Sequence, residues 1–209
     1  MKILLVDDHA MLRGGLKLVL AEAFLSVEFG EAGNSQQALA AAVAQPWDLI
    51  VLDISMLGQS GLEVLVEIHA RCPTIPVLML SMFTERQYAV RALQAGASGY
   101  LTKASAGTEL VRAIEHILAG GRYVSAELAE QLASVMGRGA KGQLHEHLSN
   151  RELEILRLIA AGKTLKEMVA LLVLSGNTIS TYRARLLDKM KMRTNAELTH
   201  YAILNRLVE

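Results

Sequence analysis

A run of four apolar residues at 49–52 leads directly into Asp53, with no turn residue between them. An apolar run of strand length fits a β-strand that is buried on both faces of a parallel sheet. Asp53 would then lie at the carboxyl end of this strand, the edge where open α/β sheets bind ligands. An isolated aspartate at such a point also fits a residue that only ends a strand or caps a helix.

The first 120 residues alternate between strand patterns and helix patterns. Short apolar runs are followed by stretches with apolar residues at helical spacing, and glycine or proline separates many of the segments. The predicted strands are 3–6, 27–29, 49–53, 77–81 and 99–101. Repeated strand–helix units predict an α/β fold with a doubly wound, parallel, five-stranded sheet.

Polar residues stand where four of these strands end. They are Asp7 with Asp8, Asp53, Ser81 and Lys103. Because the carboxyl ends of parallel strands meet at one edge of a sheet, we expect these side chains to converge. Three carboxylates that repel one another favour a hard cation with oxygen ligands, such as Mg²⁺. A metal ion and a lysine beside a carboxylate would offset the charge of a transferring group, so the pattern indicates a phosphoryl-acceptor site.

Over roughly residues 1–120, this pattern resembles the receiver domain of two-component response regulators. The matching positions are Asp7, Asp8, the motif LDISM at 52–56, Ser81, Tyr100 and Lys103. The resemblance implies a flavodoxin-like fold in which Asp53 accepts a phosphoryl group from a sensor histidine kinase. Two positions depart from the pattern, since many relatives carry proline at Leu57 and some carry it at Ala104.

The resemblance also implies a role for each residue of the site. Ser81 would hydrogen-bond the phosphoryl oxygens, Lys103 would pair with them, and Tyr100 would move with Ser81 when the domain switches. The Mg²⁺ ligands would be Asp8, Asp53, the backbone carbonyl of Ser55 and, through a bound water, Asp7.

The pattern changes after residue 121. Residues 125–136 fit a helix, and the glycine-rich segment 137–142 fits a flexible linker. His145 and His147 follow, and without cysteine or a third ligand they are more typical of a solvated segment than of a metal site. The predicted divisions are a receiver domain at 1–122, a helical segment and linker at 123–144, and a second domain at 145–209.

The second domain carries only helix patterns. Ser149 and Glu152 fit a capping box at the start of its first helix. A second helix is predicted from Thr164 to about residue 172, a third at 178–190 and a fourth at 195–207, so we expect an all-α, four-helix domain. Two short helices joined by the tight turn at 175–177 predict a helix-turn-helix.

Residues 146–207 resemble the LuxR-type DNA-binding domain, so the whole chain resembles a NarL/FixJ-type response regulator. The matching residues are Leu148, Ser149, Arg151, Glu152, Ile159, Ala160, Gly162, Lys166, Glu167, Leu174, Ser175, Thr178 and Ile179. The resemblance implies that exposed residues of the third helix enter the major groove of double-stranded DNA, namely Asn177, Ser180, Thr181, Ala184 and Arg185. Many relatives carry Lys at the position of Ser180 and a basic residue near Ala184, so we expect Arg183 and Arg185 to be the stronger anchors to guanine or phosphate.

The second helix of this domain is unusually apolar, with the run 168–174. Relatives usually carry a small residue at the position of Val169 and polar residues at Ala170 and Leu171. Such a surface fits a contact with the receiver or a second protomer, and it also fits a tolerated surface without a partner.

Composition narrows the class of protein. The net charge is zero, but residues 1–125 contain 9 basic and 12 acidic residues, whereas residues 145–209 contain 10 and 7. This asymmetry fits a cation-binding part joined to a part that binds an anionic partner. The single cysteine, Cys72, excludes an internal disulfide and fits a reducing cytosol. Because no apolar run approaches the roughly 18 residues needed to span a bilayer and the N-terminal run is too short for a signal peptide, we expect a cytoplasmic chain without a membrane partner.

Together these patterns predict a phosphorylation-controlled transcription regulator that forms a homodimer when phosphorylated. It would not be an enzyme, except that a receiver can catalyse its own phosphorylation and dephosphorylation. Two alternatives remain open. A Mg²⁺-dependent aspartyl-phosphate enzyme would use similar carboxylates but would leave the helical domain unexplained. A regulator with weak or lost DNA binding would act through protein contacts, with the apolar second helix as the binding surface.

Overall fold

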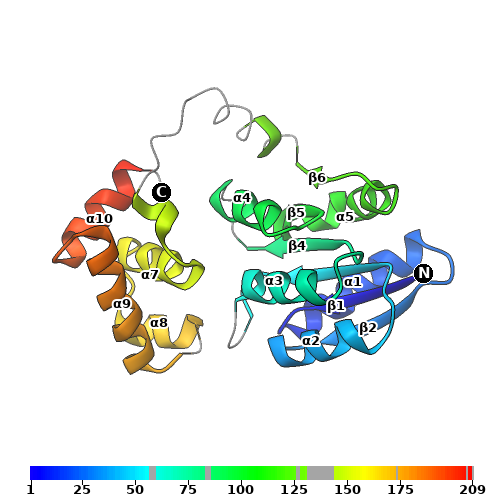
Figure 1. The fold of residues 1–209 in the computed structure, drawn as a ribbon, viewed down its shortest axis with the longest axis horizontal. Coiled ribbons are helices and arrows are strands. Elements are labelled where there is room, and N and C mark those ends of the chain that lie inside the picture. The colour runs from blue at the N-terminus through cyan, green and yellow to red at the C-terminus, as the bar shows by residue number, and fades with distance from the viewer. Residues whose placement is uncertain are drawn as a thin grey trace. The chain divides into compact units, whose positions relative to one another are not determined.

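The computed structural model describes residues 1–56, 60–82, 86–125, 128–130, 144–172, 174–205 and 207–208. Contacts divide the chain into two compact units, residues 1–139 and residues 140–209 (Figure 1). Most of the predicted helix at 125–136, the glycine-rich segment and Leu57 lie outside the described residues.

The first unit is a parallel sheet whose strands alternate with helices. The strands, in the spatial order β2-β1-β3-β4-β5-β6, are β1 (Lys2–Val6), β2 (Glu28–Ala32), β3 (Leu49–Asp53), β4 (Val77–Ser81), β5 (Gly99–Thr102) and β6 (Tyr123–Val124). The helices between them are α1 (Ala10–Ala23), α2 (Ser35–Ala44), α3 (Gly61–Arg71), α4 (Arg86–Gln94) and α5 (Lys103–Leu118).

The helices form two sets, which cover the two faces of the sheet. Helix α1 packs against α5, whereas α3 packs against both α2 and α4. Every residue of the two central strands, β3 and β4, is buried. This confirms the predicted doubly wound α/β fold, in which the continuous apolar runs are strands covered on both sides.

The sheet has six strands, however, and not the predicted five. In the register of β5 and β6, Gly99 lies opposite Tyr123. The aromatic ring of Tyr123 holds the strand in place, because the Arg112 guanidinium lies 5.6 Å from the ring centroid and the hydroxyl donates to Glu109 Oε2 at 3.2 Å. A strand of two residues has no periodicity of its own, so its backbone pairing with β5 and these side-chain contacts define it.

The second unit is helical. It contains a short 3₁₀ helix, η1 (Leu144–His147), followed by α7 (Asn150–Ala160), α8 (Leu165–Leu172), α9 (Gly176–Met190) and α10 (Asn195–Leu204). Helix α7 packs on α9 and α10, and α8 packs on α9. The apolar stripe of α9 is buried, which confirms the expected all-α helix-turn-helix architecture, and its members are Ile179, Leu186 and Met190.

The predicted capping box at the start of α7 is also confirmed. The backbone N–H of Ser149 donates to Glu152 Oε2 at 2.7 Å, and the backbone N–H of Glu152 donates to Ser149 Oγ at 3.3 Å. These reciprocal bonds satisfy two amide groups that the first turn of a helix leaves without partners.

The expectation of a solvated His145 is wrong. This side chain is 1% exposed, and its Nδ1 lies 2.9 Å from the hydroxyl of Tyr201 on α10. The two residues are 56 positions apart in sequence, so no local pattern could have predicted the contact. Within the described ranges, no helix has the length and apolar character needed to cross a membrane.

We predict that Gly61→Ala is strongly destabilising. A Cβ at this position would lie 2.0 Å from the backbone oxygen of Asp53 and 2.8 Å from Ile54 Cα, because α3 begins directly against the end of β3. Such overpacking should lower the free energy of unfolding by about 1–3 kcal/mol or more. The matched control is Gly107→Ala in α5, where a Cβ meets no atom within 4 Å and should raise stability by about 0.5–1 kcal/mol. Urea unfolding of both variants tests this, and equal stabilities would contradict the close approach.

Candidate functional site

The carboxyl edge of the sheet brings together residues from three separate elements. Lys103 Nζ lies 2.6 Å from Asp7 Oδ2 and 2.9 Å from Asp53 Oδ2. Asp7 follows β1, Asp53 ends β3, and Lys103 is the first residue of α5. All three side chains are buried, with exposed fractions of 8% for Lys103, 2% for Asp7 and 0% for Asp53. The convergence that was expected from the parallel sheet is therefore present for these residues.

The position of Lys103 follows from the capping of α5. Thr102 is the N-cap, and its Oγ1 accepts a hydrogen bond from the backbone N–H of Ser105 at 3.1 Å. This bond begins the helix directly at the end of β5. The backbone of Lys103 therefore lies at the edge of the sheet, and its side chain reaches the two carboxylates from there.

Charge is unbalanced at this edge. Burial raises the pKa of Asp53, the neighbouring Asp7 carboxylate raises it further, and Lys103 offsets these effects only in part. Burial alone would lower the pKa of Lys103, but attraction by Asp53 and Asp7 raises it above the usual value, so the ammonium group stays charged. One ammonium group for two carboxylates leaves an excess of negative charge, which a further cation would offset.

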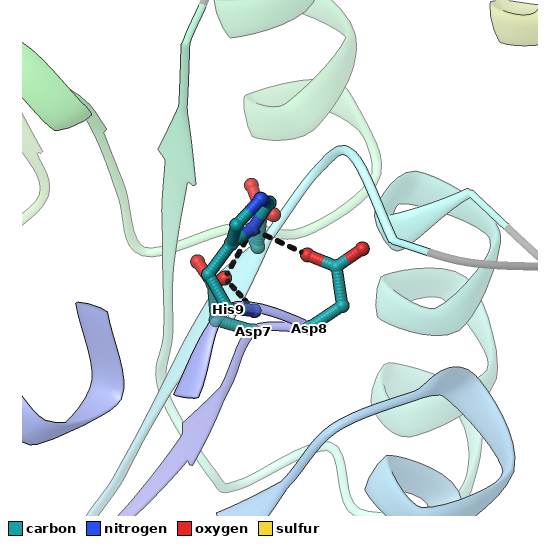
Figure 2. Close-up of side chains that lie close together, drawn as sticks. Asp7, Asp8 and His9 are labelled. Atoms are coloured by element: carbon teal, nitrogen blue, oxygen red, sulfur yellow. Dashed lines mark hydrogen bonds and ion pairs between the residues drawn. The ribbon is translucent and has the colours of Figure 1, made fainter. Parts of the chain in front are cut away.

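Asp8 and His9 complete a group of possible metal ligands. Asp7, Asp8, His9 and Asp53 each offer one ligand atom, and these atoms all lie within 4.8 Å of one another. His9 Nδ1 lies 2.7 Å from Asp8 Oδ1 and 3.2 Å from Asp7 Oδ1 (Figure 2). The carboxylate oxygens fit a hard cation such as Mg²⁺.

Hydrogen bonding distinguishes the three carboxylates. In Asp7, Oδ1 accepts from the backbone N–H of His9 at 2.8 Å and Oδ2 forms an ion pair with Lys103. In Asp53, Lys103 contacts Oδ2, both oxygens are buried, and a backbone hydrogen bond from Ser55 partly opposes the rise in the pKa of this carboxyl group. In Asp8, the ring of His9 contacts Oδ1. Each of the three carboxylates therefore has at least one close polar contact, and the choice of direct cation ligands among them stays a prediction.

His9 and Arg13 were not recognised from the sequence. The Arg13 guanidinium donates to the backbone oxygen of Asp7 at 2.6 Å and to Glu31 Oε2 at 2.9 Å, so it fixes the chain at the end of β1. The only sequence signal was position, since His9 directly follows the acidic pair and Arg13 lies one helical turn later.

Ser81 and Tyr100 form a second part of the same edge. Ser81 is completely buried at the end of β4, and Tyr100 is 2% exposed on β5. Burial raises the pKa of Tyr100 to about 12, and a hydrogen bond with Ser81 opposes this change. The serine hydroxyl is therefore engaged by the tyrosine. Ser55 follows β3 near Asp53, and the role of its carbonyl as a ligand stays a prediction.

One face of helix α9 in the second unit is exposed. The residues that were expected to face DNA are exposed, namely Asn177, Ser180, Thr181, Ala184 and Arg185. Two of the hydroxyls are turned to the helix itself, because Ser180 Oγ donates to the Gly176 oxygen at 2.8 Å and Thr181 Oγ1 donates to the Asn177 oxygen at 2.9 Å.

Arg183 lies apart from this exposed face. It is only half-buried, and its Nε donates to Asn195 Oδ1 at 2.7 Å. The bond joins α9 to the first residue of α10. Of the two arginines, Arg185 is therefore the one on the exposed face of α9. Arg183 is held by its hydrogen bond to Asn195.

Helix α8 buries only part of its apolar surface in the second unit. Met168 is buried, whereas Leu165 is 48% exposed and Leu171 is 59% exposed. The apolar surface noted in the sequence is therefore partly accessible.

Comparison with known proteins identifies both units. Residues 3–115 match the response regulator receiver domain, and residues 146–202 match the luxR family of bacterial regulatory proteins. The chain is 34% identical over 206 residues to response regulator UvrY of Escherichia coli strain K12, covering 98% of this chain and 94% of UvrY. It is 36% identical over 205 residues to transcriptional activator protein ExaE of Pseudomonas putida, covering 97% and 96%. It is 32% identical over 212 residues to response regulator GacA of Pseudomonas aeruginosa, covering 100% and 98%.

Solved structures share the fold. A LuxR-family two-component response regulator from an Aurantimonas species has a TM-score of 0.61 at 34% identity, covering 65% of this chain and 96% of that chain. RcsB of Salmonella enterica serovar Typhimurium, bound to a promoter, has a TM-score of 0.63 at 24% identity and covers 96% of this chain and 97% of that one.

We predict that Asp53→Asn stabilises the chain at neutral pH in the absence of divalent cations. Because the pKa of Asp53 is raised in the folded state, its stabilising contribution is complete below the ordinary value near 4 and is lost as pH rises through the raised value. At pH 7 the ionised carboxylate therefore destabilises the fold, and its removal should raise Tm by roughly 2–4 °C, corresponding to about 1 kcal/mol.

Thermal unfolding at pH 7 and at pH 3.5 measures this difference, which should shrink at the lower pH. Glu22→Gln is the control, since this carboxylate of α1 is exposed. A lower Tm for Asp53→Asn at pH 7 would show that the ion pair with Lys103 outweighs the cost of burial.

Proposed function

Because the chain belongs to the two-component response regulators with a receiver domain and a LuxR-type DNA-binding domain, we propose that phosphorylation of Asp53 by a sensor histidine kinase controls its binding to promoter DNA. The observation that carries the proposal is the buried group in which Lys103 lies 2.6 Å from Asp7 and 2.9 Å from Asp53. The shared family supports transcription regulation as the output, and not conversion of a metabolite.

Asp53 supplies the nucleophile. One of its carboxylate oxygens attacks the phosphorus of a phosphohistidine, and the phosphorus–nitrogen bond breaks as the new phosphorus–oxygen bond forms. Lys103 already contacts this carboxylate and offsets charge on the transferring group. Asp8, Asp53, the Ser55 carbonyl and, through water, Asp7 would hold Mg²⁺, which would supply further charge neutralisation.

The buried edge then transmits the change. Phosphorylation adds about 1.5 to 2 negative charges to Asp53. The Ser81 hydroxyl, which hydrogen-bonds Tyr100, lies at the end of the strand next to β3 and turns to the phosphoryl oxygens. Tyr100 then loses its hydrogen bond to Ser81. The environment of Tyr100 changes, and this alters the surface formed by β5 and the elements beside it.

The second unit supplies the DNA contacts. It carries the basic excess of the chain, and the exposed face of α9 includes Asn177, Thr181 and Arg185. A homodimer would present two α9 helices to two half-sites in the major groove. Because its partner is promoter DNA, the protein would act in the cytoplasm.

Two observations favour a second candidate, an output through protein contacts. Leu165 and Leu171 are exposed on α8, and Ser180 on α9 stands where many relatives have Lys. In this case the apolar face of α8 binds a partner, and DNA affinity is weak.

The phosphorylation switch predicts that Asp53→Asn abolishes the increase in DNA affinity caused by a small-molecule phosphodonor. Random-sequence duplexes that the phosphorylated chain selects provide the target, and fluorescence anisotropy with Mg²⁺, with and without acetyl phosphate, provides the measurement. Glu22→Gln should keep the full response. An equal response in Asp53→Asn would refute the acceptor role, and no binding by any form would favour the protein-contact output.

Arg185→Ala should weaken DNA binding while leaving the fold intact. Loss of one phosphate or base contact is expected to cost about 1–3 kcal/mol in binding and to lower the salt slope by about 1 if the contact is to phosphate. Arg183→Ala should instead lower the stability of the second unit by about 0.5–1.5 kcal/mol, because it removes the bond to Asn195. Anisotropy at several salt concentrations and thermal unfolding separate the two effects. Unchanged DNA affinity in Arg185→Ala would rule out this side chain as an anchor.

A further inference from the structure

Two neighbouring hydroxyl groups on the exposed face of α9 are already hydrogen-bonded within the helix. Thr181 Oγ1 donates to the Asn177 backbone oxygen at 2.9 Å, and Ser180 Oγ donates to the Gly176 backbone oxygen at 2.8 Å. A contact with the carbonyl four residues earlier is a common way in which a helical Ser or Thr satisfies its hydroxyl. Because the Thr181 side chain is exposed while its hydroxyl is engaged, the group that it presents to a ligand is its γ-methyl.

Ala184 places a second methyl group beside this one. Residues three apart on a helix are neighbours on its surface, with Cβ atoms about 5–6 Å apart. Thr181 and Ala184 are both exposed, so together they form one small apolar area. Asn177 lies one turn before Thr181 and is exposed as well. This row of three residues therefore presents one side-chain amide and two methyl groups, and none of the three is charged.

The basic residues of α9 are Arg183, Arg185 and Lys189, and two of them are tied to other helices of the second unit. Arg183 Nε donates to Asn195 Oδ1 on α10 at 2.7 Å, and Lys189 Nζ donates to Glu152 Oε2 on α7 at 2.8 Å. Arg185 is exposed, and it would contact a phosphate or a guanine. Most of the base-reading capacity of α9 is therefore in the uncharged row.

We propose that Thr181 and Ala184 determine sequence specificity by contacting the 5-methyl groups of thymine in the major groove. The proposal rests on the proposed function and names the class of sequence that α9 recognises, which is half-sites with A·T pairs opposite this row. In unmodified DNA only thymine carries a methyl group in the major groove, and the side chains of Ala and Thr are suited to contact it. The exposed amide of Asn177 fits the same class, because Asn pairs with N6 and N7 of adenine.

Replacement of thymine by deoxyuridine tests the proposal, because uracil lacks only the 5-methyl group and keeps its pairing with adenine. Duplexes that the whole phosphorylated chain selects from a random library are made again with uracil at one thymine position at a time. Two positions in each half-site should be sensitive. Each lost methyl contact should lower the affinity about 4-fold, the effect expected from exposing one apolar carbon group. Fluorescence anisotropy measures the affinities.

Two substitutions of Thr181 separate its methyl group from its hydroxyl. Thr181→Ser keeps the hydroxyl, so it should no longer distinguish thymine from uracil at one of the two positions. Thr181→Val keeps a methyl group and should retain the discrimination. The position that Ala184 contacts should stay sensitive in both variants and provides the internal control. Val, Ser and Thr have similar helix propensities, and thermal unfolding checks that both variants keep the fold.

Three results would overturn the proposal while DNA binding itself remains. Equal affinity for thymine and uracil at every position would show that no methyl group is contacted. Selected half-sites made only of G·C pairs would have the same meaning. Retention of both sensitive positions in Thr181→Ser would assign the contact to another group, such as the hydroxyl. If the phosphorylated chain binds no duplex at all, the proposed function is itself wrong, and the inference falls with it.

Discussion

The contact of one buried ammonium group with two buried carboxylates is the interaction on which the functional edge of the first unit depends. Lys103 reaches Asp7 and Asp53 from the start of α5, and all three groups are almost removed from water. Burial of ions is costly unless each has a close partner of opposite charge. This edge of the sheet carries one positive group for two negative ones, so it is electrostatically incomplete without a further cation, and it can respond strongly to a new charge.

The geometry of this edge comes from backbone features that carry no charge. Gly61 allows α3 to begin against the end of β3, and Thr102 starts α5 at the end of β5. Arg13 fixes the backbone of Asp7 from α1. Helices α1, α3 and α5 therefore each help to hold one charged residue in place. A substitution at the start of one of these helices would move the site as much as a substitution of a site residue.

Most of the acidic site could be predicted, because a parallel sheet forces the carboxyl ends of its strands to one edge. The positions of Asp7, Asp53 and Lys103 follow from this single rule. The direction of the His9 ring does not follow from this rule, since an N-cap residue can turn its side chain toward the helix or away from it. The contact between Arg183 and Asn195 was missed for a similar reason, because it depends on how α9 and α10 pack.

By itself the sequence determined the order of strands and helices, the division into an α/β part and a helical part, and the residue types at the strand ends. These features follow from local periodicity and from chain direction. The tertiary structure alone decided the sixth strand, the burial of His145 against Tyr201 and the pairing of His9 with Asp8. Such contacts depend on side-chain direction and on packing between distant segments, and neither leaves a repeating pattern in the chain.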